Sequence, residues 1–110
     1  MAYKGEDIPI IIEGDNNNNL DELEFQVVFY PHDDLDNKRV IKKSELIKEG
    51  NNVYSGVIPY SMTMQMPIGY YSVEVLIIAP ESETIGSVER RIFKKDGAFI
   101  LYDSASKNLV

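Results

Sequence analysis

The chain has 110 residues, of which 44% are hydrophobic and 26% are charged, a balance typical of a globular protein. Its formal net charge of -7 repels phosphate backbones and anionic lipid surfaces, which argues against a nucleic acid or a membrane as partner. There are no cysteines, so disulfides, thiolate metal sites and cysteine nucleophiles are excluded. Stability must come from packing.

The length predicts a single domain over residues 1–110, with an ordered core over residues 4–102. The longest strongly apolar stretches, Ile8 to Ile12 and Val75 to Ala79, are too short to cross a bilayer. The first residues lack the basic flank and apolar run of a secretory signal. We therefore predict no signal peptide and no membrane span, and a chain that is cytoplasmic when synthesised.

Alternation of apolar and polar residues predicts several strands in chain order. Glu6 to Glu13 is expected to be an edge strand, because Pro9 removes a backbone donor. Glu22 to Tyr30 alternates most clearly. Ser44 to Lys48 fits either a helical turn or a continuing strand. Further strands are predicted at Arg39–Lys42, Val53–Ile58, Gly69–Ala79, Val88–Phe93 and Ala98–Tyr102.

Turn-forming residues separate these strands. Pro80 to Gly86 is a predicted turn, and Lys94 to Gly97 ends in Asp-Gly, which favours a tight hairpin. Ser61 to Pro67 predicts one helical turn with Ser61 as its cap. About seven short strands with frequent turns predict an all-β fold, an immunoglobulin-like antiparallel β-sandwich.

The acidic loop from Asp15 to Asp21 spaces oxygen ligands like the first half of a calcium-binding EF-hand loop. Leu20 stands where that loop needs glycine, and Gln26 stands where it needs a bidentate glutamate. We interpret the segment as a solvated turn and predict neither a metal nor a cofactor.

His32 is the only histidine, so any imidazole-based acid–base chemistry would have to use it. The sequence offers no nucleophile at a recognisable spacing, such as Gly-x-Ser-x-Gly, and no glycine-rich phosphate loop. We interpret His32 as a surface turn residue and predict that the chain is not an enzyme.

The one basic cluster of this acidic chain comprises Arg90, Arg91, Lys94 and Lys95. Strand alternation places Arg90 and Arg91 on opposite faces. The cluster fits either a charged edge that deters aggregation or a contact surface.

Large side chains gather in the middle of the chain. Tyr60 and Tyr70 fit a core position and an interface equally well, whereas Tyr71 is expected in the core. Met62 and Met66, one helical turn apart, are expected to cover one end of the sandwich.

Four stretches of sequence carry a family resemblance. They are Lys4-Gly-Glu-Asp-Ile-Pro-Ile-Ile-Ile, Phe25-Gln-Val-Val-Phe-Tyr, Tyr54-Ser-Gly-Val-Ile-Pro-Tyr-Ser and Met66-Pro-Ile-Gly-Tyr-Tyr-Ser-Val-Glu-Val-Leu-Ile. In this arrangement the chain resembles the immunoglobulin-like module of phage and prophage tail, baseplate and fibre proteins, including the N-terminal domain of baseplate upper proteins. In the last stretch the glycine takes the turn and a tyrosine can tie the corner through its hydroxyl.

The resemblance implies a non-catalytic structural or adaptor module of a phage or prophage particle, with the virion as its final location. Such a module docks to protein partners, either itself or neighbouring subunits. An acidic end, with Glu13 and Asp21, could then dock head to tail against the basic strand. The alternative is a stand-alone module that binds carbohydrate or protein through Tyr60 and Tyr70.

Overall fold

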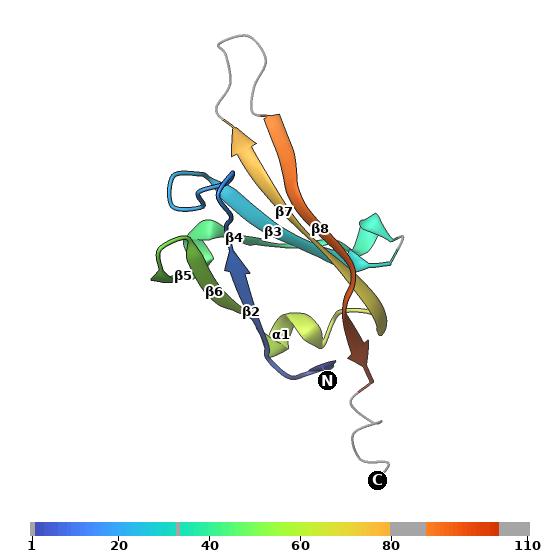
Figure 1. Ribbon diagram of the computed structural model, residues 1–110. Coiled ribbons are helices and arrows are strands. Elements are labelled where there is room, and N and C mark those ends of the chain that lie inside the picture. Colours follow the sequence, from blue (N-terminus) through green and yellow to red (C-terminus); the bar gives the residue numbers. More distant parts are fainter. Residues whose placement is uncertain (1, 33, 80–87, 104–110) are drawn as a thin grey trace.

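The computed structural model describes residues 2–32, 34–79 and 88–103, and it consists mostly of β-strands (Figure 1). The strands in chain order are β1 (Ala2–Tyr3), β2 (Ile8–Glu13), β3 (Phe25–Pro31), β4 (Arg39–Lys42), β5 (Ile47–Gly50), β6 (Val53–Ile58), β7 (Gly69–Ala79) and β8 (Val88–Tyr102). The helical elements are the 3-10 turns η1 (Leu35–Asn37) and η2 (Lys43–Glu45) and the helix α1 (Tyr60–Thr63). The predicted all-β class is confirmed. The predicted turn at Pro80 to Gly86 lies outside the described residues.

The strands form two sheets. The larger sheet has five strands in the order β1-β8-β7-β3-β4, and the smaller has three in the order β2-β6-β5. Neighbouring strands run antiparallel, except that β1 pairs in parallel with the end of β8. In Figure 1 the smaller sheet lies across one face of the larger. The β2 strand is at the edge of the smaller sheet, as Pro9 predicted.

The core lies between the two sheets. One cluster of buried side chains joins Ile8 and Ile58 of the smaller sheet to Phe29 and Tyr71 of the larger. A second cluster joins Tyr54 of β6 to residues of β3 and β7. Because both clusters draw side chains from both sheets, the architecture is that of a β-sandwich.

Three predicted strands have the bounds that the structure shows, namely β4, β6 and β7. Their alternation is regular and turn residues flank them, so the local pattern is sufficient to predict where these strands begin and end. The sequence from Ser44 to Lys48 fitted either a helical turn or a strand. The structure has both, because η2 ends at Glu45 and β5 begins at Ile47.

The predicted hairpin at Lys94 to Gly97 is wrong, because β8 runs without interruption through these residues. Val73 pairs with Lys95 and Tyr71 with Phe99, so residues 96–98 all lie opposite Ser72. Gly97 adopts a positive φ of 63°, and the Ser72 hydroxyl donates to the Asp96 carboxylate at 2.8 Å. The Asp-Gly pair therefore forms a large β-bulge, for which glycine supplies the same left-handed conformation as in a turn.

The predicted cap of the helical turn is also wrong. α1 begins at Tyr60, before Ser61, and the Asp7 carboxylate accepts the Tyr60 N–H at 2.7 Å. Thr63 at the other end of the helix accepts the Gly5 N–H at 3.0 Å. The segment between β1 and β2 thus caps the first N–H of α1 and bonds to the Thr63 side chain, which fixes α1 at one end of the sandwich.

Tyr71 and Met66 are fully buried, as expected for a core residue and for a side chain that covers one end of the sandwich. The Tyr71 ring stacks on Phe99 with centroids 4.9 Å apart, and its hydroxyl donates to the Pro67 carbonyl at 2.6 Å. Burial raises the pKa of this hydroxyl to about 12, so it remains a donor at any physiological pH. The bond closes the turn that leads into β7.

Tyr71→Phe is expected to lower the free energy of unfolding by about 1 kcal/mol, because it removes this bond and leaves the ring in place. Tyr70→Phe is the matched control, since its side chain is 62% exposed, and it should change stability by less than about 0.5 kcal/mol. Urea unfolding followed by circular dichroism measures both. Equal effects would show that the Tyr71 hydroxyl bond does not stabilise the fold.

Candidate functional site

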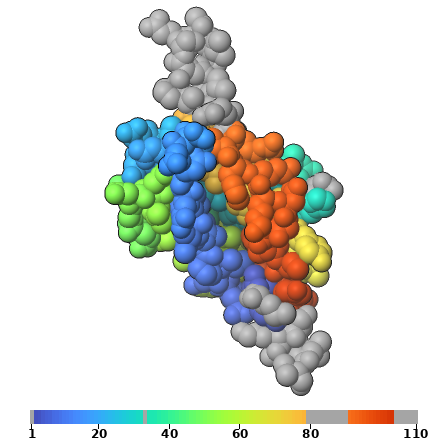
Figure 2. All heavy atoms as spheres, in the orientation of Figure 1, coloured from blue at the N-terminus to red at the C-terminus, as the bar shows by residue number. Residues whose placement is uncertain are grey.

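An apolar groove opens between β2 and β8, where the edges of the two sheets face each other. It has a volume of about 450 Å³ and reaches the core, with Val73 and Val75 of β7 among its lining residues. Ile10 and Ile12 of β2 form part of the other wall. Figure 2 shows the two strands side by side, with deeper parts of the chain visible between them.

The shape of β8 explains why the groove is apolar on that side. Val75 pairs with Phe93 and Leu76 with Arg91, so Ile92 is an extra residue in the strand. At such a bulge two successive side chains turn toward the same face. Ile92 and Phe93 both line the groove, and Phe93 is 49% exposed there. An exposed aromatic side chain beside an open strand edge is typical of a binding surface.

Charged side chains lie at the border of the groove. Glu13 and Asp15 line it where β2 ends, and Lys95 lines it from β8. The middle of the groove is therefore apolar and its border is charged, the distribution found in protein-binding sites.

The structure does not bring the predicted basic cluster together as one surface. Arg91 is paired with Glu74 at 3.0 Å, and Lys94 lies 3.7 Å from Asp96. Lys95 instead lines the groove. Arg90 lies opposite Ile77 in the β7–β8 ladder, and its side chain is outside the described part of the structure.

The two tyrosines that fitted either a core or an interface are both on the surface. Tyr60 is 58% exposed at the start of α1, and Tyr70 is 62% exposed near the start of β7. Their rings are accessible to a ligand, whereas Tyr71 is not.

His32 lines a hollow on the outer face of the larger sheet, together with Tyr30, Leu35, Ser72, Lys94 and Asp96. The Ser72 hydroxyl donates to Asp96, and this hydrogen bond is the main reason that the pKa of Asp96 is below its usual value. A serine nucleophile would instead donate to the base that activates it. In this structure the Ser72 hydroxyl proton is directed to the Asp96 carboxylate.

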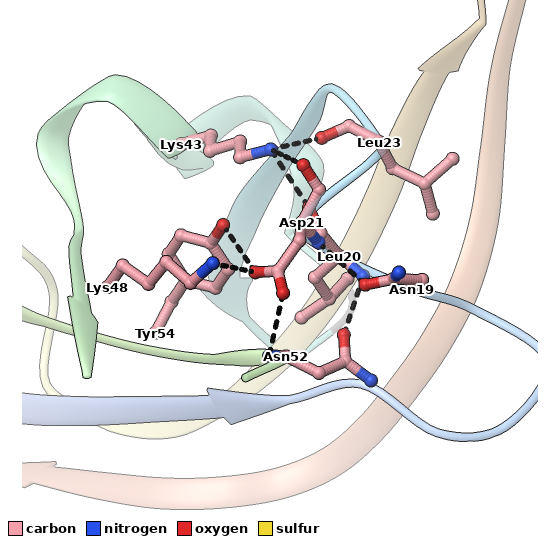
Figure 3. A network of polar contacts seen from close by, with 8 residues as sticks. All are labelled: Asn19, Leu20, Asp21, Leu23, Lys43, Lys48, Asn52 and Tyr54. Carbon is pink, nitrogen blue, oxygen red and sulfur yellow. Dashed lines mark hydrogen bonds and ion pairs between the residues drawn. The ribbon is translucent and has the colours of Figure 1, made fainter. Parts of the chain in front are cut away.

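Asp21 of the acidic loop makes hydrogen bonds to other parts of the fold (Figure 3). Its carboxylate accepts the Tyr54 hydroxyl at 2.9 Å and the Asn52 N–H at 3.1 Å, and it lies 3.2 Å from the Lys48 ammonium. The hydrogen bond from Tyr54 is the largest of the interactions that lower the pKa of Asp21, against a smaller opposing effect of burial. Asp21 joins the loop to β5 and β6.

Lys43 holds the same loop from the other side (Figure 3). Its ammonium donates to the carbonyls of Leu20, Asp21 and Leu23 at 2.9, 3.3 and 2.7 Å. It also lies 5.5 Å from the ring centroid of Tyr54. Sequence reasoning missed this role, because a lysine that follows a strand gives no signal of its three carbonyl partners.

The Asp15 carboxylate, considered above as a calcium ligand, accepts the backbone N–H groups of Asn17 and Asn18, each at 2.9 Å. This is the local hydrogen bonding of an Asp-initiated turn. Among the described residues, no group of three histidine or acidic side chains could hold a metal ion.

No family model, curated protein or solved structure matches this chain. Among the described residues no helix has the length and apolar character needed to cross a membrane.

The outer face of the smaller sheet carries an apolar patch that sequence reasoning missed. The patch consists of Ile11, Ile47 and Val57, which are 70%, 66% and 49% exposed. Ile11 and Ile47 both pair with Ser55, so they lie in one row across the three strands. The run Ile10-Ile11-Ile12 contains the signal, because in a strand the middle of three consecutive residues points away from the other two.

Proposed function

We propose that the chain is a non-catalytic module with an immunoglobulin-like fold that works by docking to protein, either itself or neighbouring subunits. The groove between β2 and β8 carries this proposal. It offers apolar surface that reaches the core, and along the β2 edge it offers backbone groups that no described strand uses. An extended protein segment can use both at once.

The immunoglobulin-like assignment is supported by strand order. Immunoglobulin sandwiches place their second, fifth and fourth strands in one sheet, and their third, sixth and seventh strands in the other. The sheets β2-β6-β5 and β8-β7-β3 follow this order if β1 is the first strand and β4 is an addition next to the third. The hydroxyl of Tyr71, near the start of β7, bonds back to Pro67, as in the tyrosine corner of that fold.

The proposed setting is a phage or prophage particle, with a structural or adaptor role of tail or baseplate type. Its support is the motif from Met66 to Val75, which supplies the buried Met66, the turn at Gly69 and the bonded Tyr71. In this setting the chain is made in the cytoplasm and ends in the virion. Mass spectrometry of particles induced from the source cells tests the setting, and absence of the chain from them would contradict it.

Light scattering of the purified chain, over a range of protein concentrations and at low and high salt, tests the docking role. A discrete oligomer of closed size is the expected result. If the charged ends dock head to tail, salt should weaken the oligomer and the double change of Arg90 and Arg91 to glutamate should break it. A monomer under all conditions would contradict docking to itself.

A ligand-binding module is the second candidate, supported by the exposure of Tyr60 and Tyr70. Carbohydrate is a suitable ligand class, because sugar rings stack on exposed tyrosines whose hydroxyls remain available for hydrogen bonds. Binding on a glycan array that disappears when both tyrosines are changed to alanine would support it. An array without signal would exclude carbohydrate as the ligand.

A further inference from the structure

β2 is an open strand edge whose unpaired groups can be identified. It pairs with β6 along its whole length, and no other described strand lies beside it. In an antiparallel ladder, alternate residues direct both their N–H and C=O toward one neighbour. The Gly14 N–H bonds to the Asn52 carbonyl on the β6 side, so the even-numbered residues of β2 face β6. The odd-numbered residues Pro9, Ile11 and Glu13 face the open edge.

Pro9 agrees with this assignment, because a proline in a strand is tolerated where its missing N–H would face away from the ladder. The open edge therefore offers the N–H and C=O of Ile11 and of Glu13, but only the C=O of Pro9. Proline and charge, which usually deter edge pairing, are present only near the two ends of this edge. Its centre is the apolar run Ile10-Ile11-Ile12.

We propose that β2 pairs antiparallel with β2 of a second copy of this chain, about a two-fold axis at Ile11. The inference rests on the proposed docking function and names its partner. Each Ile11 N–H then donates to the Ile11 carbonyl of the other copy, and each Glu13 N–H donates to the carbonyl of the other copy's Pro9. The N–H that proline lacks falls at the end of the new ladder, where its absence costs least.

The side chains are self-complementary in the same register. Glu13 lies across from Pro9, so within the ladder from Pro9 to Glu13 no like charges stand opposite each other. Ile11, 70% exposed in one copy, meets the Ile11 of the other on the outer face. A second copy in this register accepts from both N–H groups that the β2 edge offers, those of Ile11 and Glu13, through its own Ile11 and Pro9 carbonyls. The smaller sheets of the two copies would form one continuous sheet in the order β5-β6-β2-β2-β6-β5. The mouth of each groove would lie beside the β2–β2 junction.

Ile11→Lys tests the pairing, because it places two like charges together at the axis. We expect the wild-type chain to be a dimer by light scattering at low and high salt, since backbone bonds and apolar contact form the seam. The lysine should weaken the dimer by about 100-fold in dissociation constant. Ile47→Lys is the matched control: Ile47 is exposed on the same face but lies on β5, away from the β2 edge, and this variant should remain a dimer. Circular dichroism checks that both variants fold.

Hydrogen exchange on the wild-type chain gives a second measurement that needs no variant. The amides of Ile11 and Glu13 should exchange more slowly as protein concentration rises, while those of Ile10 and Ile12 are protected at every concentration. An oligomer that persists in Ile11→Lys, or fast exchange at Ile11 in the oligomer, would overturn edge pairing and leave docking intact. A wild-type monomer at every concentration would overturn both the pairing and docking of the chain to itself.

Discussion

Lys43→Met is expected to lower the free energy of unfolding by about 3 kcal/mol. The Lys43 ammonium donates to three carbonyls of the loop between β2 and β3, and each hydrogen bond from a charged donor contributes about 1.5 kcal/mol or more when water is excluded. The side chain is only partly buried, so the sum is reduced by solvent screening. Methionine keeps a stem of similar length, so the change isolates the ammonium.

Lys42→Met is the control for Lys43→Met. Lys42 is the preceding residue and is exposed on β4, so its loss should change stability by less than about 0.5 kcal/mol. Urea unfolding of both variants by circular dichroism gives the comparison. If the two variants were equally stable, the three carbonyls would be satisfied by water at no cost, and Lys43 would have no structural role.

Gly14→Ala is expected to lower the free energy of unfolding by about 2 kcal/mol, because it disturbs the same loop between β2 and β3. A Cβ at Gly14 would overlap the side-chain amide of Asn52 and would lie 2.5 Å from the backbone oxygen of Asn18. Asn52 cannot simply move away, because its Oδ1 accepts the Leu20 N–H at 2.6 Å and its own N–H donates to Asp21. Relieving the overlap therefore breaks hydrogen bonds that hold the loop, and overpacking adds its own strain.

Gly50→Ala is the matched control for Gly14→Ala, because no atom lies within 4 Å of a Cβ at Gly50. It should be neutral or slightly stabilising, since alanine restricts the unfolded chain more than glycine does. Thermal unfolding of the two variants distinguishes a local overlap from a general intolerance of glycine substitution. A Gly14→Ala protein as stable as Gly50→Ala would show that Asn52 has room to rearrange.

The sequence allowed the fold class and most strands to be predicted, because strand alternation is a local property. β7 was predicted with its observed bounds from the pattern around Tyr71 and Val75. The continuity of β8 was missed because Asp96-Gly97 carries the same local signal for a bulge and for a turn. The difference lies in β7, which is long enough to pair with the chain on both sides of the bulge.

The groove could not be predicted for a similar reason. Which strand edges are left open depends on strand order, and strand order is decided by packing between distant segments. The cap on α1 is an example, because Asp7 lies 53 residues before Tyr60. Sequence reasoning did identify β2 as an edge strand from its short β-branched run and Pro9, but it could not show that β8 faces it across an apolar opening.

The bulge at residues 96–98 makes the two long strands of the larger sheet unequal in their tolerance of length changes. A residue lost from the middle of β7 would exchange inward for outward side chains along the rest of the strand. A residue lost from 96–98 would fall where three residues already oppose Ser72, and the pairing on either side could stay in place. Descendants of this sequence that differ in length are therefore expected to gain or lose residues at Asp96-Gly97, while β7 keeps its length.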